Sequence, residues 1–147
     1  MARPLEPEMN TTVDLVPSHT PVREVMSPGI IAISGDTTIR DCAASMSERG
    51  THAVLVVDPT TRTPAGWVFH RDILSHLRED PFVTRAADVV SQEATYIHPE
   101  ETVDEAANRM IEEDCTHLLV GDGPEAVPQG VLSSWDLVRY YAGPPRG

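Results

Sequence analysis

The residues best suited to chemistry lie in two matching segments of this 147-residue chain. Residues 66–72 read Gly-Trp-Val-Phe-His-Arg-Asp, and residues 130–136 read Gly-Val-Leu-Ser-Ser-Trp-Asp. In the second segment Ser133 supplies a hydroxyl and Asp136 a carboxylate at the start of an expected helix, whose free N–H groups favour a phosphate. One carboxylate accepts hydrogen bonds from both hydroxyls of a ribose, and each such charge-assisted bond contributes about 1.5–3 kcal/mol. The pattern therefore indicates ligand binding.

The same residues also have purely structural interpretations. An aspartate in the first turn of a helix caps free N–H groups and interacts favourably with the helix dipole without any ligand. The two interpretations are balanced for Asp72, whereas the adjacent serines favour a ligand at Asp136. Trp67 and Trp135 are expected to be core or dimer contacts rather than stacking platforms.

The two segments belong to an internal duplication. Asp72 and Asp136 are 64 residues apart, and the same offset holds without a gap over the preceding residues. It pairs Val25 with Val89, Ser27 with Ser91, Thr38 with Thr102, Met46 with Met110 and Pro64 with Pro128. Two copies with so long a period indicate one supersecondary unit that packs against its own duplicate, rather than an open array. Binding sites are then expected between the copies.

Each copy is predicted to fold as strand, helix, strand, strand, helix. Thr38 and Thr102 precede apolar helical stripes and are predicted N-caps, Thr102 within a capping box. These helices run to about Arg49 and Glu113. Strands are predicted at residues 30–34, 53–57, 94–98 and 117–120, with return strands from about Ala65 and Gln129. The final helices start near Arg71 and Trp135, and Pro81 ends the first of them.

In this arrangement the sequence resembles a pair of cystathionine-β-synthase (CBS) domains, also called a Bateman module. The resemblance rests on the duplicated unit, the Thr-x-x-Asp/Glu helix starts and the Gly-x-Val-x-x-x-Asp segment. It implies an α/β (α+β) fold of two β-α-β-β-α repeats related by a pseudo-twofold axis. It also implies dimers formed through the helices, and clefts that bind ligands such as AMP, ATP or S-adenosylmethionine. The repeats are expected at residues 21–80 and 81–142, between a flexible arm (1–20) and a disordered tail (143–147).

By this resemblance, the preferred ligand pocket lies in the second repeat. Its residues would be Ser133, Ser134 and Asp136, with Thr95 and Tyr96 facing the base and with His117 and Leu118 close by. His117 also fits a packed or hydrogen-bonded role without any chemistry. The first repeat departs from the pattern because Phe69 stands where the hydroxyl belongs, although Asp72 remains and His70 and Arg71 add positive charge. That pocket is expected either to be closed or to bind phosphate differently.

Composition excludes several classes of function. The 23 acidic and 11 basic residues give a net charge of −12, which repels nucleic acid and anionic lipid. The longest apolar run, residues 53–57, is too short to cross a membrane, and no secretory signal is visible, so a cytoplasmic location is expected. Cys42 and Cys115 have no metal or redox spacing and are expected to be reduced packing residues. No Walker, Gly-x-Ser-x-Gly or His-Glu-x-x-His motif is present, so neither an enzyme nor a metal site is expected.

The leading hypothesis is a stand-alone regulatory CBS pair that needs no cofactor. It would be a homodimer that binds an adenosyl ligand and signals to an unidentified protein partner in trans. AMP, adenosine or S-adenosylmethionine is expected rather than ATP, because residues 133–136 contain no basic side chain and only Arg139 follows a turn later. The alternative is a ligand-free dimerisation or interaction module whose clefts are filled by its own side chains.

Overall fold

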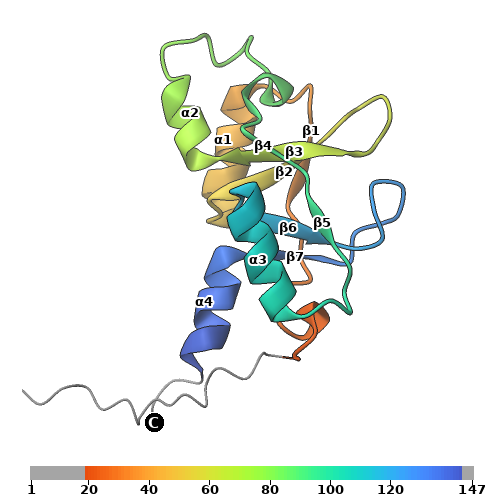
Figure 1. Ribbon diagram of the computed structural model, residues 1–147. Helices are drawn as coiled ribbons and strands as arrows, with labels where there is room; N and C mark the ends of the chain where they lie inside the picture. The colour runs from red at the N-terminus through yellow and green to blue at the C-terminus, as the bar shows by residue number, and fades with distance from the viewer. Residues whose placement is uncertain (1–18, 144–147) are drawn as a thin grey trace, which may run out of the picture.

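The structure, a computed structural model, describes residues 19–143. The predicted flexible arm and disordered tail therefore lie almost entirely outside the described residues. The first repeat consists of β1 (Ala32–Ser34), α1 (Ile39–Arg49), β2 (Ala53–Val57), β3 (Pro64–Phe69) and α2 (His70–Ser75). The second consists of β5 (Tyr96–Ile97), α3 (Val103–Glu113), β6 (His117–Val120), β7 (Gly130–Ser133) and α4 (Ser134–Ala142). The predicted β-α-β-β-α order is confirmed in both repeats (Figure 1).

The helix starts follow from the capping threonines. The hydroxyl oxygens of Thr38 and Thr102 accept hydrogen bonds from the backbone N–H groups of Asp41 and Glu105, both at 3.2 Å. Glu105 in turn accepts from the Thr102 N–H at 2.9 Å, which completes the predicted capping box. Helices α1 and α3 end at Arg49 and Glu113, as predicted.

Helix α2 is shorter than predicted and ends at Ser75, well before Pro81. The His76 ring supplies the reason, because its Nδ1 lies 2.8 Å from the carbonyl oxygen of Asp72. That carbonyl would otherwise accept the next helical hydrogen bond. The His76 N–H instead donates to the Ile73 carbonyl at 3.0 Å, which tightens the last turn.

The two sheets pack face to face. In each, a first strand runs parallel to the central strand β2 or β6, which forms an antiparallel hairpin with β3 or β7. Side chains of β2 alternate, so that Val54 and Val56 lie in the core with the helices while Leu55 joins Trp67 and Leu119 between the sheets. The central strands are thus covered on both faces, as their continuous apolar runs predicted.

Each repeat is completed by a segment that leads into the other repeat. Strand β4 (Gln92–Glu93) enters the second repeat but pairs with β3 of the first. At the matching position Ser27 enters the first repeat but forms a β-bridge with Val131 of the second. The short 3₁₀ helices η3 (Val22–Glu24) and η4 (Ala86–Val89) precede these strands and contribute buried residues to the cores of the second and first repeats, respectively. The two repeats are therefore interlocked.

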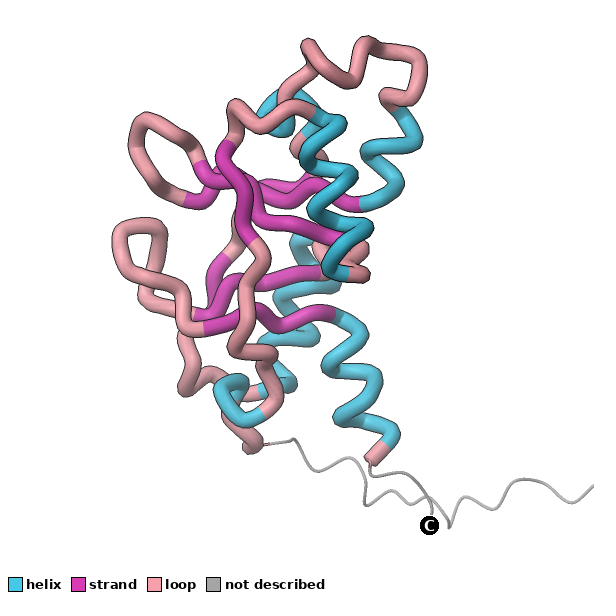
Figure 2. The backbone as a smooth tube through the Cα atoms, turned by 180° about the vertical axis from the view of Figure 1, so that it is seen from behind, coloured by secondary structure: helices cyan, strands magenta, loops and turns pink. Residues whose placement is uncertain are grey.

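The molecule has a helical side and an opposite side from which loops project. Helices α1, α2 and α4 lie on one side, and the hairpin loops that follow β2 and β6 project from the opposite side (Figure 1, Figure 2). Cys42 and Cys115 are buried and free, and burial raises the pKa of the Cys42 thiol to about 11. No helix between residues 19 and 143 has the length and apolar character needed to cross a membrane.

Candidate functional site

A cavity of about 680 Å³ opens between the repeats, where β3 ends and β6 begins. Its wall comes from residues 51–53, 69–72, 91–92 and 116–117, together with Asp114 and Ser134. The volume lies within the range of about 300–1,000 Å³ typical of small-molecule sites. Of the predicted site residues, the structure brings together His70, Arg71, Asp72, His117 and Ser134 at this cavity.

Asp72 is one of the two carboxylates in this wall, with Asp114, and it combines a capping role with spare hydrogen-bonding capacity. Its Oδ2 accepts from the Phe69 N–H and from the Ser91 hydroxyl, both at 2.7 Å. Its Oδ1 accepts no hydrogen bond from any residue between 19 and 143. Asp72 is thus both a helix cap and a half-buried acceptor at the edge of the cavity.

Ser91 supplies the hydroxyl that the first repeat lacks at Phe69. It reaches the carboxylate from the segment that crosses between the repeats, 19 residues along the chain from Asp72. Sequence reasoning did not identify Ser91 as a site residue. The available signal was its match with Ser27 in the duplication, which marked the position without showing its partner.

Asp136 has a different environment, although it occupies the matching position. Its side chain is 5% exposed, its Oδ2 accepts from the Ser133 N–H at 2.8 Å, and its Oδ1 forms an ion pair with Arg139. The Ser133 hydroxyl accepts from the Asp136 N–H at 3.1 Å, which completes a capping box. Neither Ser133 nor Asp136 lines the 680 Å³ cavity. Both oxygens of Asp136 are already used within the second repeat.

His117 is a packed, neutral histidine in the cavity wall. Its ring centroid lies 5.0 Å from that of Trp67 and 5.2 Å from that of Phe69. Its Nδ1 lies 2.9 Å from the Thr116 hydroxyl oxygen. Burial lowers the pKa of His117, and the negative charge of Asp136 offsets this effect only in part. The imidazole can therefore take part in hydrogen bonding at neutral pH without adding charge to the cavity.

Gln92 joins the two repeats across the cavity wall. Its Oε1 accepts from the Thr116 N–H at 3.1 Å, and its Nε2 donates to the His117 carbonyl at 3.3 Å. The carboxamide thus pairs with the backbone of the second repeat from a strand of the first sheet. This contact could not be predicted from the sequence, because nothing local distinguishes Gln92 from a solvated glutamine.

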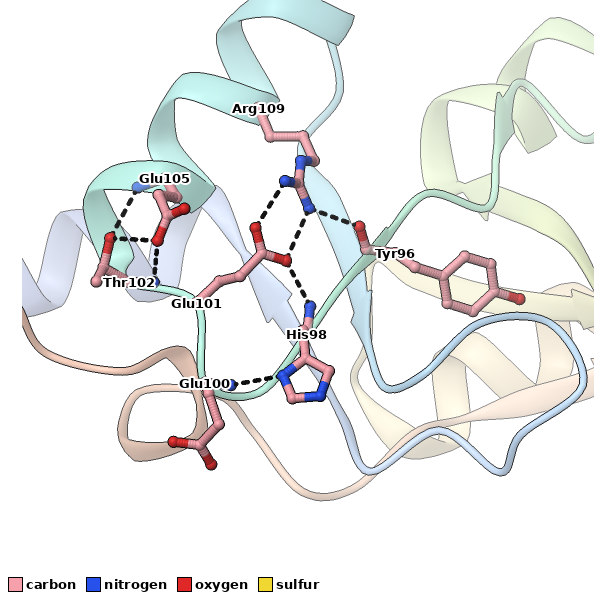
Figure 3. Close-up of polar contacts among 7 residues, drawn as sticks. All are labelled: Tyr96, His98, Glu100, Glu101, Thr102, Glu105 and Arg109. Atoms are coloured by element: carbon pink, nitrogen blue, oxygen red, sulfur yellow. Dashed lines mark hydrogen bonds and ion pairs between the residues drawn. The ribbon is translucent and has the colours of Figure 1, made fainter.

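The remaining predicted residues have structural surroundings away from the cavity. Leu118 is completely buried in the core of the second repeat, and the Thr95 carbonyl accepts from the Leu119 N–H at 2.8 Å. The Tyr96 side chain lies between the sheets, where its hydroxyl has no partner among the described residues and burial raises its pKa. Its carbonyl accepts from Arg109 at 2.9 Å, on the side away from the ring (Figure 3).

The charges around the cavity are mixed. Arg71 faces the same space as Asp72 and Asp114, and the rings of His52 and His70 lie 4.9 Å apart, tilted by 54°. Within residues 19–143 no group of three or more His, Cys, Asp or Glu side chains is placed to hold a metal ion. The wall therefore offers hydrogen-bond donors, acceptors and aromatic faces with little net charge.

Comparison with known proteins identifies the family of this arrangement. The sequence matches the CBS domain over residues 22–79 and again over residues 86–143. A protein with CBS domains from Burkholderia ambifaria MC40-6 shares 26% identity and a TM-score of 0.73, over 87% of this chain and 98% of that one. No curated protein sequence matches the chain.

Two further structures share the fold at lower identity. The CBS domain pair of protein MJ0100, in complex with 5′-methylthioadenosine and S-adenosyl-L-methionine, has 21% identity and a TM-score of 0.72, over 86% of this chain and 98% of that one. The CBS domain of a bacterial CNNM/CorC family Mg²⁺ transporter has 19% identity and a TM-score of 0.76, over 88% and 79%. With two family matches on two interlocked β-α-β-β-α repeats, the chain belongs to the CBS-domain family and is a regulatory CBS pair.

Proposed function

We propose that this CBS pair binds an adenosyl ligand in the cavity bordered by Asp72 and signals the bound state to a protein partner in trans. AMP, adenosine and S-adenosylmethionine are the candidate ligands. The observation that carries the proposal is the Asp72 Oδ1, which accepts no hydrogen bond from the described part of the chain and lies at the edge of a 680 Å³ cavity. The site would consist of Asp72, Arg71, His70, His117 and Ser134.

The hydrogen bonds favour the Asp72 cleft over the Asp136 cleft. A ribose diol needs a carboxylate that can accept two further hydrogen bonds in a partly dry site. Within residues 19–143 one oxygen of Asp72 accepts no hydrogen bond, whereas both oxygens of Asp136 are held by Ser133 and Arg139. We therefore propose the site in the first repeat, where Ser91 supplies a hydroxyl in place of the one missing at Phe69.

The charges around the cavity favour ligands with little negative charge. Arg71 is matched there by Asp72 and Asp114, and the whole chain carries −12. A single phosphate can be accommodated beside Arg71, whereas a triphosphate would leave most of its charge uncompensated. The complex of the MJ0100 CBS pair with two adenosyl compounds supports the same ligand class.

Signalling would follow from differential affinity for two arrangements of the repeats. Ser91 and Gln92 belong to the segment that crosses between the repeats. Both form hydrogen bonds with other residues of the cavity wall. A ligand held by Asp72 would therefore favour one position of that segment, and with it one packing of the two sheets. A homodimer formed through the helical side would present the resulting surface to the partner.

The decisive experiment compares Asp72→Asn with Asp136→Asn by calorimetry. Asparagine still accepts the capping hydrogen bond, so both variants are expected to fold. Loss of the charge-assisted bonds, at about 1.5–3 kcal/mol, should weaken nucleoside binding about 10- to 150-fold in Asp72→Asn. Asp136→Asn should bind like the unmodified chain. A loss of nucleoside affinity seen only in Asp136→Asn would assign the site to the second repeat instead.

A ligand-free interaction module is the second candidate. Exposed apolar side chains on the helical side favour it, among them Leu74, Leu77, Trp135 and Tyr141. A ligand that binds only the folded state raises its melting temperature, by an amount set by concentration and affinity. If none of AMP, adenosine and S-adenosylmethionine stabilises the folded protein in a thermal-shift experiment, this second candidate replaces the first.

A further inference from the structure

The second repeat closes the outer edge of its first strand with its own side chains. Arg109 donates to the Tyr96 carbonyl at 2.9 Å, and Glu101 accepts from the His98 N–H at 2.8 Å (Figure 3). Both of these backbone groups point away from β6, because the alternate residues of the segment pair with that strand. The edge of β5 is therefore already satisfied at these two positions.

The first repeat leaves the equivalent edge open. Strand β1 is the outermost strand of its sheet, and the Ile31 carbonyl and the Gly35 N–H pair with β2 and its end. Because backbone groups alternate in direction along a strand, those of Ala32 and Ser34 point away from β2. Within residues 19–143 no hydrogen bond reaches the Ala32 N–H, the Ala32 carbonyl or the Ser34 N–H. These three groups can pair with another strand.

The difference between the two edges follows from the duplication. The offset of 64 residues matches Arg109 with Ser45 and Glu101 with Thr37. Serine and threonine side chains are shorter and carry no charge, so they cannot close the edge in the same way. Strand β1 also contains no proline or charged side chain of the kind that discourages pairing at an edge. The first repeat thus lacks the pair of side chains that protects the second.

A second cavity of about 680 Å³ adjoins this edge, between the loops that follow β2 and β6 (Figure 2). We call it the loop-side hollow, and its lining includes Ala32, Leu55 and Val127. Ala32 stands where the second repeat has Tyr96, whose ring lies between the sheets. A cavity of about 370 Å³ continues along the strand to Ser34. The open edge is therefore flanked by space for side chains from a partner.

The charges near the edge favour a basic partner. Glu125 lines the loop-side hollow, Asp58 lines the smaller cavity, and Asp36 lies just beyond the end of β1. Arg62 lines both cavities, and Arg85 donates to the Asp36 carbonyl at 3.1 Å. These arginines compensate the carboxylates only in part, and the whole chain carries −12. A positively charged segment would be attracted to this side of the molecule.

We propose that the open edge of β1 is the docking site for the protein partner, which adds an extended, basic segment to the first sheet and places an apolar side chain in the loop-side hollow. Main-chain hydrogen bonds supply affinity in this mode of recognition, and the cavities beside the strand supply specificity. The proposal rests on the partner in trans of the proposed function and specifies where that partner binds.

The position of this edge suits a signal that depends on the ligand. Strand β2 is the neighbour of β1 in the sheet. Its first residue, Ala53, lines the cavity bordered by Asp72, and its last residue, Val57, lines the loop-side hollow. Ligand and partner would therefore occupy opposite ends of one strand.

A phage-displayed library of random peptides is the probe for this site. It is selected on the unmodified full chain without nucleoside, and the affinity of each enriched peptide is measured by fluorescence anisotropy. We expect enriched peptides that combine alternating apolar residues with lysine or arginine. Failure to enrich any peptide, or enrichment of acidic peptides alone, overturns the proposal.

Two variants test whether the enriched peptides use the edge of β1. Ala32→Pro removes an N–H that points away from β2, so pairing within the sheet is kept, and peptide affinity should fall at least about tenfold. Ala32→Ser keeps the N–H and should bind like the unmodified chain. The double variant Thr37→Glu with Ser45→Arg introduces the residue types that close the second repeat, without changing net charge, and should also lose the peptide. Unchanged affinity in Ala32→Pro or in the double variant overturns the proposal.

A second copy of this chain is the competing occupant of the edge. If sedimentation equilibrium shows a dimer that Ala32→Pro converts to monomer, the edge pairs with another copy and the proposal fails. The ligand proposal is tested apart from this, because peptide affinity is measured without nucleoside. If nucleosides bind while no peptide does, only the docking proposal fails. If peptides bind at the edge while nucleosides fail to bind, the ligand proposal fails and the docking site stands.

Discussion

Arg109 and Glu101 tie helix α3 to the loop that follows β5. Arg109 donates to both carboxylate oxygens of Glu101, at 2.8 and 3.3 Å, and to the Tyr96 carbonyl at 2.9 Å (Figure 3). Glu101 also accepts from the His98 N–H at 2.8 Å. The hydrogen bonds from Arg109 lower the pKa of Glu101, and burial offsets this only in part. These hydrogen bonds link α3 to β5 and to the loop after it, so they hold the helix in position relative to the second sheet.

Replacing Arg109 by methionine should lower the free energy of unfolding by about 1–3 kcal/mol at pH 7, because a half-buried carboxylate loses its donors. Urea denaturation measures the change. Arg23→Met is the matched control, since Arg23 forms more exposed ion pairs with Glu24 and Glu100 and should change stability by less than about 1 kcal/mol. The contribution of Glu101 is present at neutral pH and is lost as the pH falls through its lowered folded-state pKa. Equal losses in the two variants would contradict this account.

His117 should make stability depend on pH in the range where histidine titrates. Burial lowers its folded-state pKa below that of an exposed histidine, about 6.5, so the unfolded chain binds the proton more readily. Its contribution to stability is therefore complete above about pH 6.5 and is lost as the pH falls below that value. His117→Gln should flatten the decrease of the urea midpoint between pH 7 and pH 5. An unchanged pH dependence would assign the effect to other groups.

At the scale of single residues, the sequence predicted the roles that depend on contacts between near neighbours in the chain. Thr38 and Thr102 are caps because their partners lie three residues away. Ser91 and Gln92 were missed because their partners lie 19 and 24 residues away, on another repeat or strand. The carboxylates of Asp72 and Asp136 look equivalent in the duplication, but Asp136 pairs with Arg139 three residues later, whereas Asp72 accepts from Ser91, 19 residues away.

At the scale of elements, periodicity predicted the helices and hairpins. It did not predict that each repeat pairs with a segment leading into the other. The apolar runs of β2 and β6 and the stripes of α1 and α3 encode which side is buried, so their bounds were predicted correctly. The two segments that cross between the repeats, at Ser27 and at residues 91–93, have no such pattern. Strand β4 is only two residues long, and its partner strand is determined by the packing of the repeats. Two glycines in the hairpins nevertheless indicate in the sequence where these segments pass.

Gly66 and Gly130 are the positions where the crossing segments pass over the hairpins. A Cβ atom at Gly66 would lie 2.4 Å from the Gln92 carbonyl oxygen, and one at Gly130 would lie 2.6 Å from that of Ser27. Gly66→Ala and Gly130→Ala should therefore each lower the free energy of unfolding by about 1–3 kcal/mol, as overpacking does. Gly29→Ala, where a Cβ meets no atom within 4 Å, is the control. Urea denaturation in which all three variants match the unmodified chain would refute the close crossing.

At the scale of the whole molecule, the interlocking makes the two repeats one cooperative structure. The first core includes Ala86 and Val89 from the segment leading to the second repeat, and the second core includes Val22 from the segment leading to the first. Neither core is complete within one repeat. The cavity wall is likewise built from residues of both repeats.

The charge of the whole molecule should decide between AMP and ATP as the ligand. The chain carries −12, and Arg71 is balanced by Asp72 and Asp114 at the cavity, so each added phosphate meets an unfavourable potential. Calorimetry at physiological salt should show AMP binding several-fold more tightly than ATP. Because salt screens this repulsion, the difference should narrow as the ionic strength rises. Tighter binding of ATP at physiological salt would mean that basic side chains reach the phosphates from elsewhere, and it would contradict this prediction.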